Sequence, residues 1–215
     1  MIVAFDGNIF AGKTTLINYL ADKIKCQRVD EHTFFVSKIK KEKKYSPVFS
    51  EHLRYLRVDR LRTKMIGRRI NLLDRSFVSL SAHVYALYFS LGADLRKKHL
   101  QILRNFLRQK KIIIPDLYIF VSCGRKVAQK RFLVDRRNDG RGASNIFMEK
   151  KYFFAVEKFN LLWQKNLSGS CVVRPWKISR RRLVRIITVF AKKKKREMSV
   201  AEIIGLTEKI FFNNY

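Results

Sequence analysis

The sequence has few cysteines and few acidic side chains, and it has no long apolar run. Its three cysteines, Cys26, Cys123 and Cys171, are odd in number, lie far apart and form no C-x-x-C pair, which argues against a disulfide framework and a zinc site. No stretch approaches the roughly 20 apolar residues of a membrane-spanning helix, and the N-terminus lacks the pattern of a secretory signal. We therefore expect a cytoplasmic protein with reduced thiols.

The shortage of acidic residues leaves a large positive charge. The 215 residues include 47 Lys and Arg but only 17 Asp and Glu, so the formal net charge is +30. Hydrophobic residues make up 47% of the chain and aromatic residues 13%, which favours a folded domain over a disordered basic tail. Because so large a charge repels itself, we expect the protein to bind anions such as phosphates, nucleic acid or anionic lipid.

Apolar runs alternate with helix-like segments along the chain. We predict strands at residues 1–5, 27–30, 70–73, 112–122 and 170–174. We predict helices at residues 15–24, 49–69, 79–108 with a possible break at Gly92, 127–135, 146–166, and from 179 onward, including 200–212. This alternation predicts an α/β fold, a parallel sheet of about five strands with helices on both faces. Without a repeat or a Ser/Gly-rich linker, residues 1–215 are expected to form a single domain with a basic helical C-terminal segment from about residue 179.

The most specific motif follows the first predicted strand. Residues 7–14 read Gly-Asn-Ile-Phe-Ala-Gly-Lys-Thr and satisfy G-x-x-x-x-G-K-[ST], with a predicted helix directly after them. In such a P-loop the backbone N–H groups surround phosphate, the lysine reaches the β- and γ-phosphates, and the hydroxyl holds Mg²⁺. We therefore predict an ATP site whose contacts come from Gly7, Asn8, Ile9, Phe10, Ala11, Gly12, Lys13, Thr14 and Thr15.

Charged residues also follow two other predicted strands. Glu31 comes after the second strand and Asp74-Arg75 after the third, and ligands of open parallel sheets bind beyond the carboxyl ends of the strands. Phosphoryl transfer needs a base near the acceptor, an acid near Mg²⁺ and cations around the moving phosphoryl group. We predict a catalytic set of Glu31, Asp74, Arg75 and Lys13, with Thr14 and Asp74 as metal ligands. A purely structural Asp74–Arg75 ion pair is the alternative.

An arginine-rich segment at residues 136–144 lies between two predicted helices. Its Arg136, Arg137 and Arg141 are expected to form a short lid that closes over the phosphates, because a guanidinium can bind phosphate through two hydrogen bonds. The glycines of the segment would serve as hinges. The alternative is a solvent-exposed basic loop.

These motifs resemble the thymidylate kinase and deoxynucleoside kinase family of P-loop proteins. The resemblance rests on FDGNIFAGKTTLINYL, LLDRSFVS, PDLYIFVSCGRKVAQKRF and the arginine-rich loop, and it covers roughly residues 1–165. It implies transfer of the γ-phosphoryl group of ATP, with Mg²⁺, to a deoxynucleoside or a deoxynucleoside monophosphate.

The two branches of this family imply different acceptors. Gly-Asn-Ile in the loop, Glu31, and Asp74-Arg75-Ser76 resemble deoxynucleoside kinases, in which such a Glu is the base for the 5′-hydroxyl and the Arg contacts phosphate. Asp74-Arg75 with Ser79 resembles thymidylate kinases, so dTMP is the alternative acceptor. We favour the deoxynucleoside.

The acceptor pocket is assigned to Phe34, Phe35, Tyr55, Ser79 and His83, although aromatic residues at helical spacing also commonly form the core. Arg54 and Arg57 would bind an acceptor phosphate in a monophosphate kinase.

The basic runs at residues 180–182 and 192–196 favour a second class of function. They would give a nucleic-acid-associated P-loop ATP-binding protein a nonspecific contact surface, although aromatic residues are not interleaved with them. A family member that no longer catalyses is a third possibility, because Leu80 stands where nucleoside kinases commonly place an acid that reads the base. The sequence leaves a homodimer open.

Overall fold

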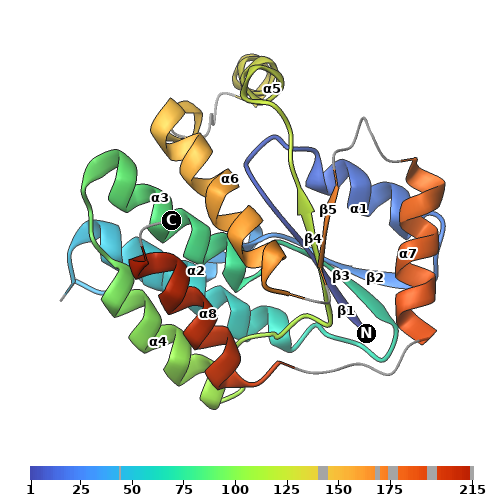
Figure 1. Ribbon diagram of the computed structural model, residues 1–215, viewed down its shortest axis with the longest axis horizontal. Coiled ribbons are helices and arrows are strands. Elements are labelled where there is room, and N and C mark those ends of the chain that lie inside the picture. Colours follow the sequence, from blue (N-terminus) through green and yellow to red (C-terminus); the bar gives the residue numbers. More distant parts are fainter. Residues whose placement is uncertain (44, 140–144, 168–169, 174–178, 193–197, 214–215) are drawn as a thin grey trace.

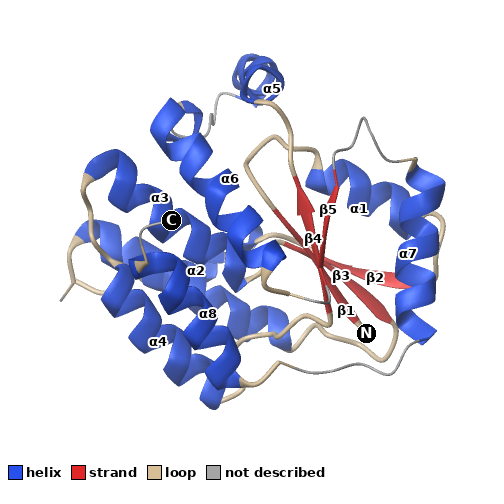
Figure 2. Cartoon of the chain, viewed as in Figure 1, coloured by secondary structure: helices blue, strands red, loops and turns tan. Residues whose placement is uncertain are grey.

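A parallel β-sheet forms the centre of the protein (Figures 1 and 2). The computed structural model describes residues 1–43, 45–139, 145–167, 170–173, 179–192 and 198–213, with side chains in all of these except 135–139 and 170–173. The strands are β1 (Ile2–Asp6), β2 (Cys26–Val29), β3 (Ile70–Asp74), β4 (Leu117–Val121) and β5 (Ser170–Val173), in the order β2-β3-β1-β4-β5. The predicted α/β fold with a parallel sheet is confirmed.

Helices cover both faces of this sheet, as Figure 1 shows. One face carries α1 (Lys13–Ala21), α5 (Arg125–Asp139) and α7 (Arg180–Lys192). The other carries α2 (Pro47–Thr63), α3 (Phe77–Leu91), α4 (Arg96–Arg108), α6 (Lys150–Lys165) and α8 (Val200–Phe212). Within β4, Leu117 and Ile119 pack on the first side and Tyr118 and Phe120 on the second, because successive side chains of a strand point to opposite faces.

The register of β1 determines which residues meet at the edge of the sheet. Phe5 of β1 is aligned with Asp74 of β3 on one side and with Ile119 of β4 on the other, in parallel pairings. Because the strands run in the same direction, their carboxyl ends lie at one edge. The segments that follow β1, β2 and β3 therefore start close together.

Local signals explain several helix ends. The Ser46 side chain accepts a hydrogen bond from the Phe49 N–H, and Pro47 occupies the first helical position of α2, where its missing N–H is not needed. Helix α3 ends at Gly92, whose φ of 66° lies in the left-handed region that glycine adopts readily. The predicted break at Gly92 is confirmed.

Several predicted boundaries are wrong, and the helix expected at residues 49–69, for example, spans Pro47–Thr63. The strand expected from residue 112 begins only at Leu117, because Pro115 has no N–H to donate and Asp116 bonds β1 through its backbone N–H and its carboxylate. The loop expected from residue 136 begins later, because α5 continues to Asp139 in a stretch without Gly or Pro. Arg136 and Arg137 therefore lie on a helix, and residues 140–144 lie outside the described residues.

Cys26 and Cys123, the two cysteines whose side chains the structure describes, are free thiols. Cys26 is half-buried and Cys123 is buried, and burial raises the pKa of both thiols. A raised pKa keeps a thiol protonated and weakly nucleophilic at neutral pH. In the portions of the chain that the structure describes, no helix has the length and apolar character needed to cross a membrane.

A buried chain of hydrogen bonds joins α2, α3 and α4. His52 Nε2 lies 2.8 Å from His99 Nδ1, His99 Nε2 lies 2.8 Å from Ser81 Oγ, and Ser81 donates to the Phe77 carbonyl. Since the Ser81 proton is used there, Ser81 must accept from His99, and His99 must in turn accept from His52. His99 is therefore neutral, and a proton added to its Nδ1 would face the N–H of His52. Burial, followed by the charge of His83, lowers the pKa of His99 from 6.5 to about 3.

This arrangement predicts a loss of stability in acid. The pKa of His99 is 6.5 when unfolded and about 3 when folded, so the unfolded state takes up the proton first and stability falls as the pH drops below 6.5. At pH 5 this one group should lower the free energy of unfolding by about 2 kcal/mol relative to pH 7.5. Urea unfolding at both pH values should show a smaller pH dependence in His99→Gln than in the native protein. An equal pH dependence in the two proteins would contradict the assignment.

Candidate functional site

The loop between β1 and α1 needs glycine at both ends. Gly7 has a φ of 132°, and a Cβ added there would lie 2.1 Å from the carbonyl oxygen of Val121 at the end of β4. Gly12, the residue before α1, has a φ of 97°. Both values favour glycine, and the turn they permit leads directly into the N-terminus of α1. The positive end of a helix dipole with free N–H groups is an anion site, as the sequence motif predicts.

Lys13 lies folded back onto the loop. Its Nζ donates to the carbonyl oxygens of Asn8 at 2.6 Å and Gly7 at 3.3 Å, and the side chain is buried. Burial and the nearby Arg75 lower the pKa of Lys13 from 10.5 to about 7, against the opposing effect of the neighbouring carboxylates. The charge of the Lys13 ammonium is therefore poorly compensated by its neighbours, and phosphate oxygens would stabilise the charged form.

Asp74 and Thr14 form the part of the site suited to a metal ion. The Thr14 hydroxyl donates to Asp74 Oδ2 at 2.7 Å. The second carboxylate oxygen, Asp74 Oδ1, is buried and has no hydrogen-bond partner among the described residues. Carboxylate and hydroxyl oxygens are hard ligands of the kind that Mg²⁺ prefers, and in phosphate sites Mg²⁺ needs only one or two carboxylates. These two residues therefore fit the predicted magnesium ligands.

Arg75 pairs with Glu31 rather than with Asp74. Its Nε donates to Glu31 Oε2 at 2.9 Å, and its Nη1 donates to the Gly7 carbonyl at 3.2 Å. Burial alone would raise the pKa of Glu31, but Arg75 and a hydrogen bond from Thr33 together lower it to about 2. Glu31 is thus ionised at neutral pH, as a proton acceptor must be. The carboxylate of Asp74 instead accepts the hydrogen bond from the Thr14 hydroxyl.

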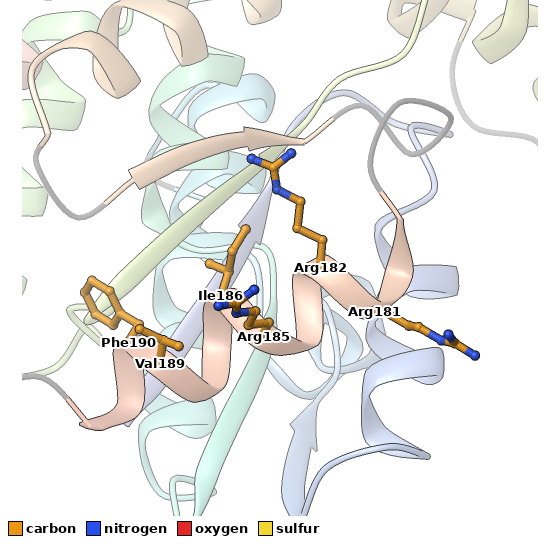
Figure 3. Close-up of a pocket in the computed structure, with 6 residues that line it drawn as sticks. All are labelled: Arg181, Arg182, Arg185, Ile186, Val189 and Phe190. Carbon is orange, nitrogen blue, oxygen red and sulfur yellow. The ribbon is translucent and has the colours of Figure 1, made fainter.

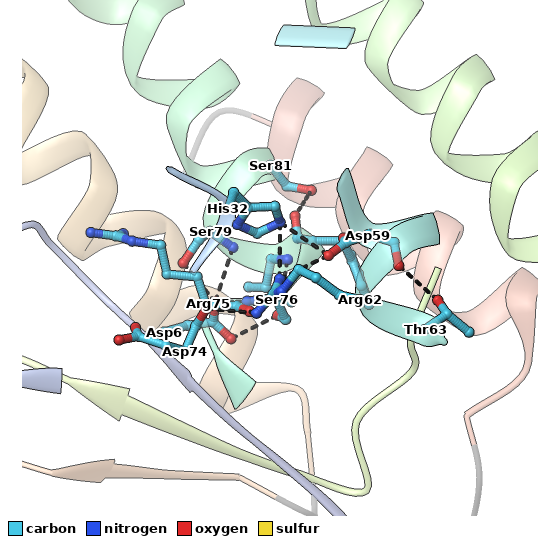
Figure 4. Close-up of polar contacts among 12 residues, drawn as sticks. Asp6, His32, Asp59, Arg62, Thr63, Asp74, Arg75, Ser76, Ser79 and Ser81 are labelled. Atoms are coloured by element: carbon cyan, nitrogen blue, oxygen red, sulfur yellow. Dashed lines mark hydrogen bonds and ion pairs between the residues drawn. The ribbon is translucent and has the colours of Figure 1, made fainter. Parts of the chain in front are cut away.

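Asp6 anchors the start of α3 to the end of β1, and the sequence motifs did not single it out. Its carboxylate accepts four hydrogen bonds: from the Ser76 N–H and hydroxyl at 2.8 and 2.7 Å, and from the Ser79 N–H and hydroxyl at 3.2 and 2.6 Å (Figure 4). Ser79, expected to contact the substrate, therefore has its hydroxyl proton engaged by Asp6. A short helix-start motif, Ser at the cap position of α3, was the only signal for this cluster.

The residues predicted to line the acceptor pocket lie in different settings. Phe34 is 66% exposed, and Phe35 is half-buried in the short turn that follows Glu31. Tyr55 is half-buried on α2, and the charge of Glu31 contributes to its raised pKa, after burial and Glu51. His83 Nδ1 lies 2.6 Å from the Tyr152 hydroxyl, which links α3 to α6. Burial, with the charge of Arg75, lowers the pKa of His83 to about 4, so its imidazole is neutral.

Two further contacts hold the P-loop and were not predicted. The Asn8 amide donates to Glu157 Oε1 at 2.9 Å and to the Phe153 carbonyl at 3.2 Å, which ties the loop to α6. Arg131 of α5 donates to the carbonyl oxygen of Phe10 at 2.8 Å. Phe10 has a φ of 59°, an uncommon conformation for a non-glycine residue. Arg131 thus reaches the loop from α5, ahead of the predicted lid segment at residues 136–144. The side chains of Arg136 and Arg137 and all of Arg141 lie outside what is described.

Solved structures of two kinds of kinase share this fold. Deoxyadenosine kinase from M. mycoides with bound dATP is 18% identical, with a TM-score of 0.62, over 90% of this chain and 100% of that chain. Thymidylate kinase from Candida albicans is 13% identical, with a TM-score of 0.63, over 92% of this chain and 97% of that chain. At these identities the likeness shows the fold, which is the P-loop kinase fold that the sequence resemblance implied. The sequence matches no protein-family model and no curated protein.

The Asp6 cluster predicts a large effect from a small substitution. Asp6→Asn replaces one acceptor oxygen by an amide NH₂ that faces hydrogen-bond donors, so unfolding in urea at pH 7 should require about 1–3 kcal/mol less free energy. Asp30→Asn is the matched control, because Asp30 pairs with Arg28 at the surface, and should change stability by less than about 1 kcal/mol. Equal effects of the two substitutions would contradict the anchoring role of Asp6.

Proposed function

We propose that this protein is an ATP-dependent kinase that transfers the γ-phosphoryl group to a deoxynucleoside, with a deoxynucleoside monophosphate such as dTMP as the alternative acceptor. One observation carries the proposal. Five residues that follow three different strands lie within hydrogen-bond distance of one another or of the P-loop: Lys13, Thr14, Glu31, Asp74 and Arg75. Phosphoryl transfer requires this combination of cations, metal ligand and base at one place.

Each residue has a role that its contacts support. Lys13 would exchange the loop carbonyls for phosphate oxygens of ATP, and Arg75 would neutralise charge on the transferred phosphoryl group. Thr14 and Asp74 would hold Mg²⁺, which supplies charge neutralisation at the phosphates when bound. Glu31 would accept the proton of the acceptor hydroxyl as its oxygen bonds to the γ-phosphorus and ADP departs.

The surroundings of α2 favour a nucleoside over a monophosphate. Arg54, considered for an acceptor phosphate, donates to Glu51 and to the carbonyls of Val36 and Ile39, and Arg57 pairs with Glu42. Both guanidiniums are thus used in holding the segment that follows β2. A nucleoside acceptor has no phosphate and so does not need to bind either guanidinium.

The function is tested by incubating the protein with ATP, Mg²⁺ and a panel of deoxynucleosides and deoxynucleoside monophosphates, and identifying the products. Deoxynucleoside monophosphates formed from deoxynucleosides are expected. Diphosphates formed from monophosphates would establish the alternative acceptor. Absence of any phosphorylated product in the complete panel would overturn the kinase proposal.

Two substitutions test the roles within the site. Lys13→Met should lower kcat at least about 100-fold, since it removes a cation that acts on the transferring phosphates. Glu31→Gln should lower kcat by about 10²–10⁴-fold while ATP binding, measured by calorimetry, persists. Lys23→Met, at an exposed lysine just after α1, is the control and should keep native activity. Full activity in Lys13→Met would refute the P-loop assignment.

We infer a second, separate capacity from α7, which is contact with single-stranded nucleic acid. A cavity of about 850 Å³ lies along this helix (Figure 3), and Arg181, Arg182, Arg185, Ile186, Val189 and Phe190 line it. Residues 180–192 contain no acidic side chain. Arginines bind phosphates, and Phe190, the one aromatic residue of this lining, offers a ring on which a base can stack. On the opposite side of the helix, Leu183 and Ile187 are fully buried toward the sheet.

Charge-reversed variants distinguish specific binding at the α7 surface from nonspecific attraction to the positive charge of the whole protein. Replacing Arg181, Arg182 and Arg185 by Glu should weaken binding of a labelled single-stranded oligonucleotide about tenfold or more in fluorescence anisotropy, and should lower the salt slope of log K by about 2. The control replaces the exposed Lys97, Arg104 and Arg108 of α4 by Glu, an equal charge change, and should retain most of the affinity. Equal losses in both variants, or preferential binding to anionic vesicles, would overturn the inference.

A further inference from the structure

Arg62, on the last turn of α2, holds the turn that carries two candidate site residues. Its Nη2 donates to the carbonyl oxygens of Asp74 at 2.7 Å and Arg75 at 2.8 Å (Figure 4). The side chain is 0% exposed. One nitrogen of a rigid, planar guanidinium therefore binds two consecutive carbonyls, so neither peptide can rotate without losing a charge-assisted hydrogen bond.

The other end of the same guanidinium is fixed by a buried carboxylate. Arg62 Nη1 donates to Asp59 Oδ1 at 2.8 Å, one helical turn away, and His32 Nε2 lies 3.0 Å from that oxygen. His32 directly follows the candidate base Glu31. Although burial opposes it, His32 and Arg62 lower the pKa of Asp59, so this carboxyl is ionised. The cluster thus joins α2, the segment after β2 and the turn after β3.

A contribution to folding stability does not by itself explain why Arg62, Asp59 and His32 are buried together. Burying a guanidinium and a carboxylate costs desolvation energy that a well-packed apolar pair would not incur. Arg62 Nε and Asp59 Oδ2 are moreover buried without hydrogen-bond partners in the described structure. Such unfavourable groups persist where the structure needs a particular geometry.

The geometry in question is the backbone of Arg75. Its φ of 64° lies in the left-handed region, which is energetically unfavourable for a non-glycine residue. The Arg75 N–H donates to the Phe5 carbonyl at 3.0 Å, and Arg62 holds the carbonyls before and after its Cα. In this conformation the Arg75 side chain reaches both Glu31 and the Gly7 carbonyl.

We propose that Arg62 is a positioning residue of the candidate kinase site, which keeps Arg75 in its left-handed conformation and thereby directs the Asp74 carboxylate and the Arg75 guanidinium to the P-loop. In the contacts described, Arg62 itself touches neither the P-loop nor Glu31, the proposed general base. This inference rests on the proposed function, and it adds a residue on which the alignment of the site depends.

The chain offers a closely matched control in Arg96 of α4. Arg96 is 9% exposed, pairs with Asp94 at 2.9 Å and donates to the Phe211 carbonyl at 2.7 Å. It therefore combines the same kinds of contact, a carboxylate and a backbone carbonyl, between α4 and α8. Replacing either arginine by lysine keeps the positive charge and removes the planar guanidinium, whose several N–H groups bind more than one acceptor.

The test compares Arg62→Lys with Arg96→Lys in the full-length protein. Arg62→Lys should lower kcat about tenfold or more with KM for ATP changed less than about twofold, because misplaced groups slow the chemical step. In the nucleotide-free protein, amide exchange over residues 74–79 should be about tenfold faster while exchange elsewhere is retained. Arg96→Lys should lower the melting temperature comparably, yet keep kcat and the exchange rate of residues 74–79.

A native kcat and native exchange over residues 74–79 in Arg62→Lys would overturn the proposal and leave Arg62 a structural residue. If Arg62→Lys fails to fold, Asp59→Asn serves instead, because it leaves both carbonyl contacts in place and removes only the charge partner. It should give a smaller loss of kcat and a smaller rise in exchange over the same residues, and native values of both would overturn the proposal. If the native protein phosphorylates nothing in the panel, the proposed function fails, whereas the exchange measurement still decides whether Arg62 holds the turn.

Discussion

The candidate site depends on the carboxylate of Asp6. Four hydrogen bonds from Ser76 and Ser79 attach the end of β1 to the start of α3. Since the P-loop begins at the next residue, Gly7, and Arg75 immediately precedes Ser76, the same contact sets the distance between the phosphate loop and the residues that follow β3. A buried carboxylate with four matched donors is rigid, because loss of any one of them leaves a polar group unsatisfied in the core.

Only some of the charges inside the site are neutralised by a neighbour of opposite charge. Arg75 and Glu31 neutralise each other, whereas Lys13 rests on neutral carbonyls and Asp74 on a neutral hydroxyl. A lysine with a pKa near 7 and a carboxylate with one unpartnered oxygen are groups that gain from an added anion and cation, respectively. Both requirements would be met by a nucleoside triphosphate with its magnesium ion, so the electrostatics of the site are consistent with the proposed chemistry.

Most of the net charge of +30 lies elsewhere. The buried arginines Arg62 and Arg96 bind carboxylates and backbone carbonyls, and they organise the turns beside α2 and α4. Many other cations are exposed, and those of α7 lie beside apolar side chains along a cavity. The charge therefore has at least two physical roles here, because a buried guanidinium serves as a fixed hydrogen-bond donor and an exposed one as a source of attraction for anions.

The sequence by itself determined the features that depend on neighbouring residues. The spacing of Gly7, Gly12, Lys13 and Thr14 specifies a phosphate loop, and the alternation of apolar runs with helical segments specifies the parallel sheet, because both patterns are local. Only the tertiary structure decided that Arg75 pairs with Glu31, 44 residues away, and that Asp6 bonds Ser76, 70 residues away. Such contacts are set by the register of parallel strands and by which helix packs beside them, and no local pattern records either one.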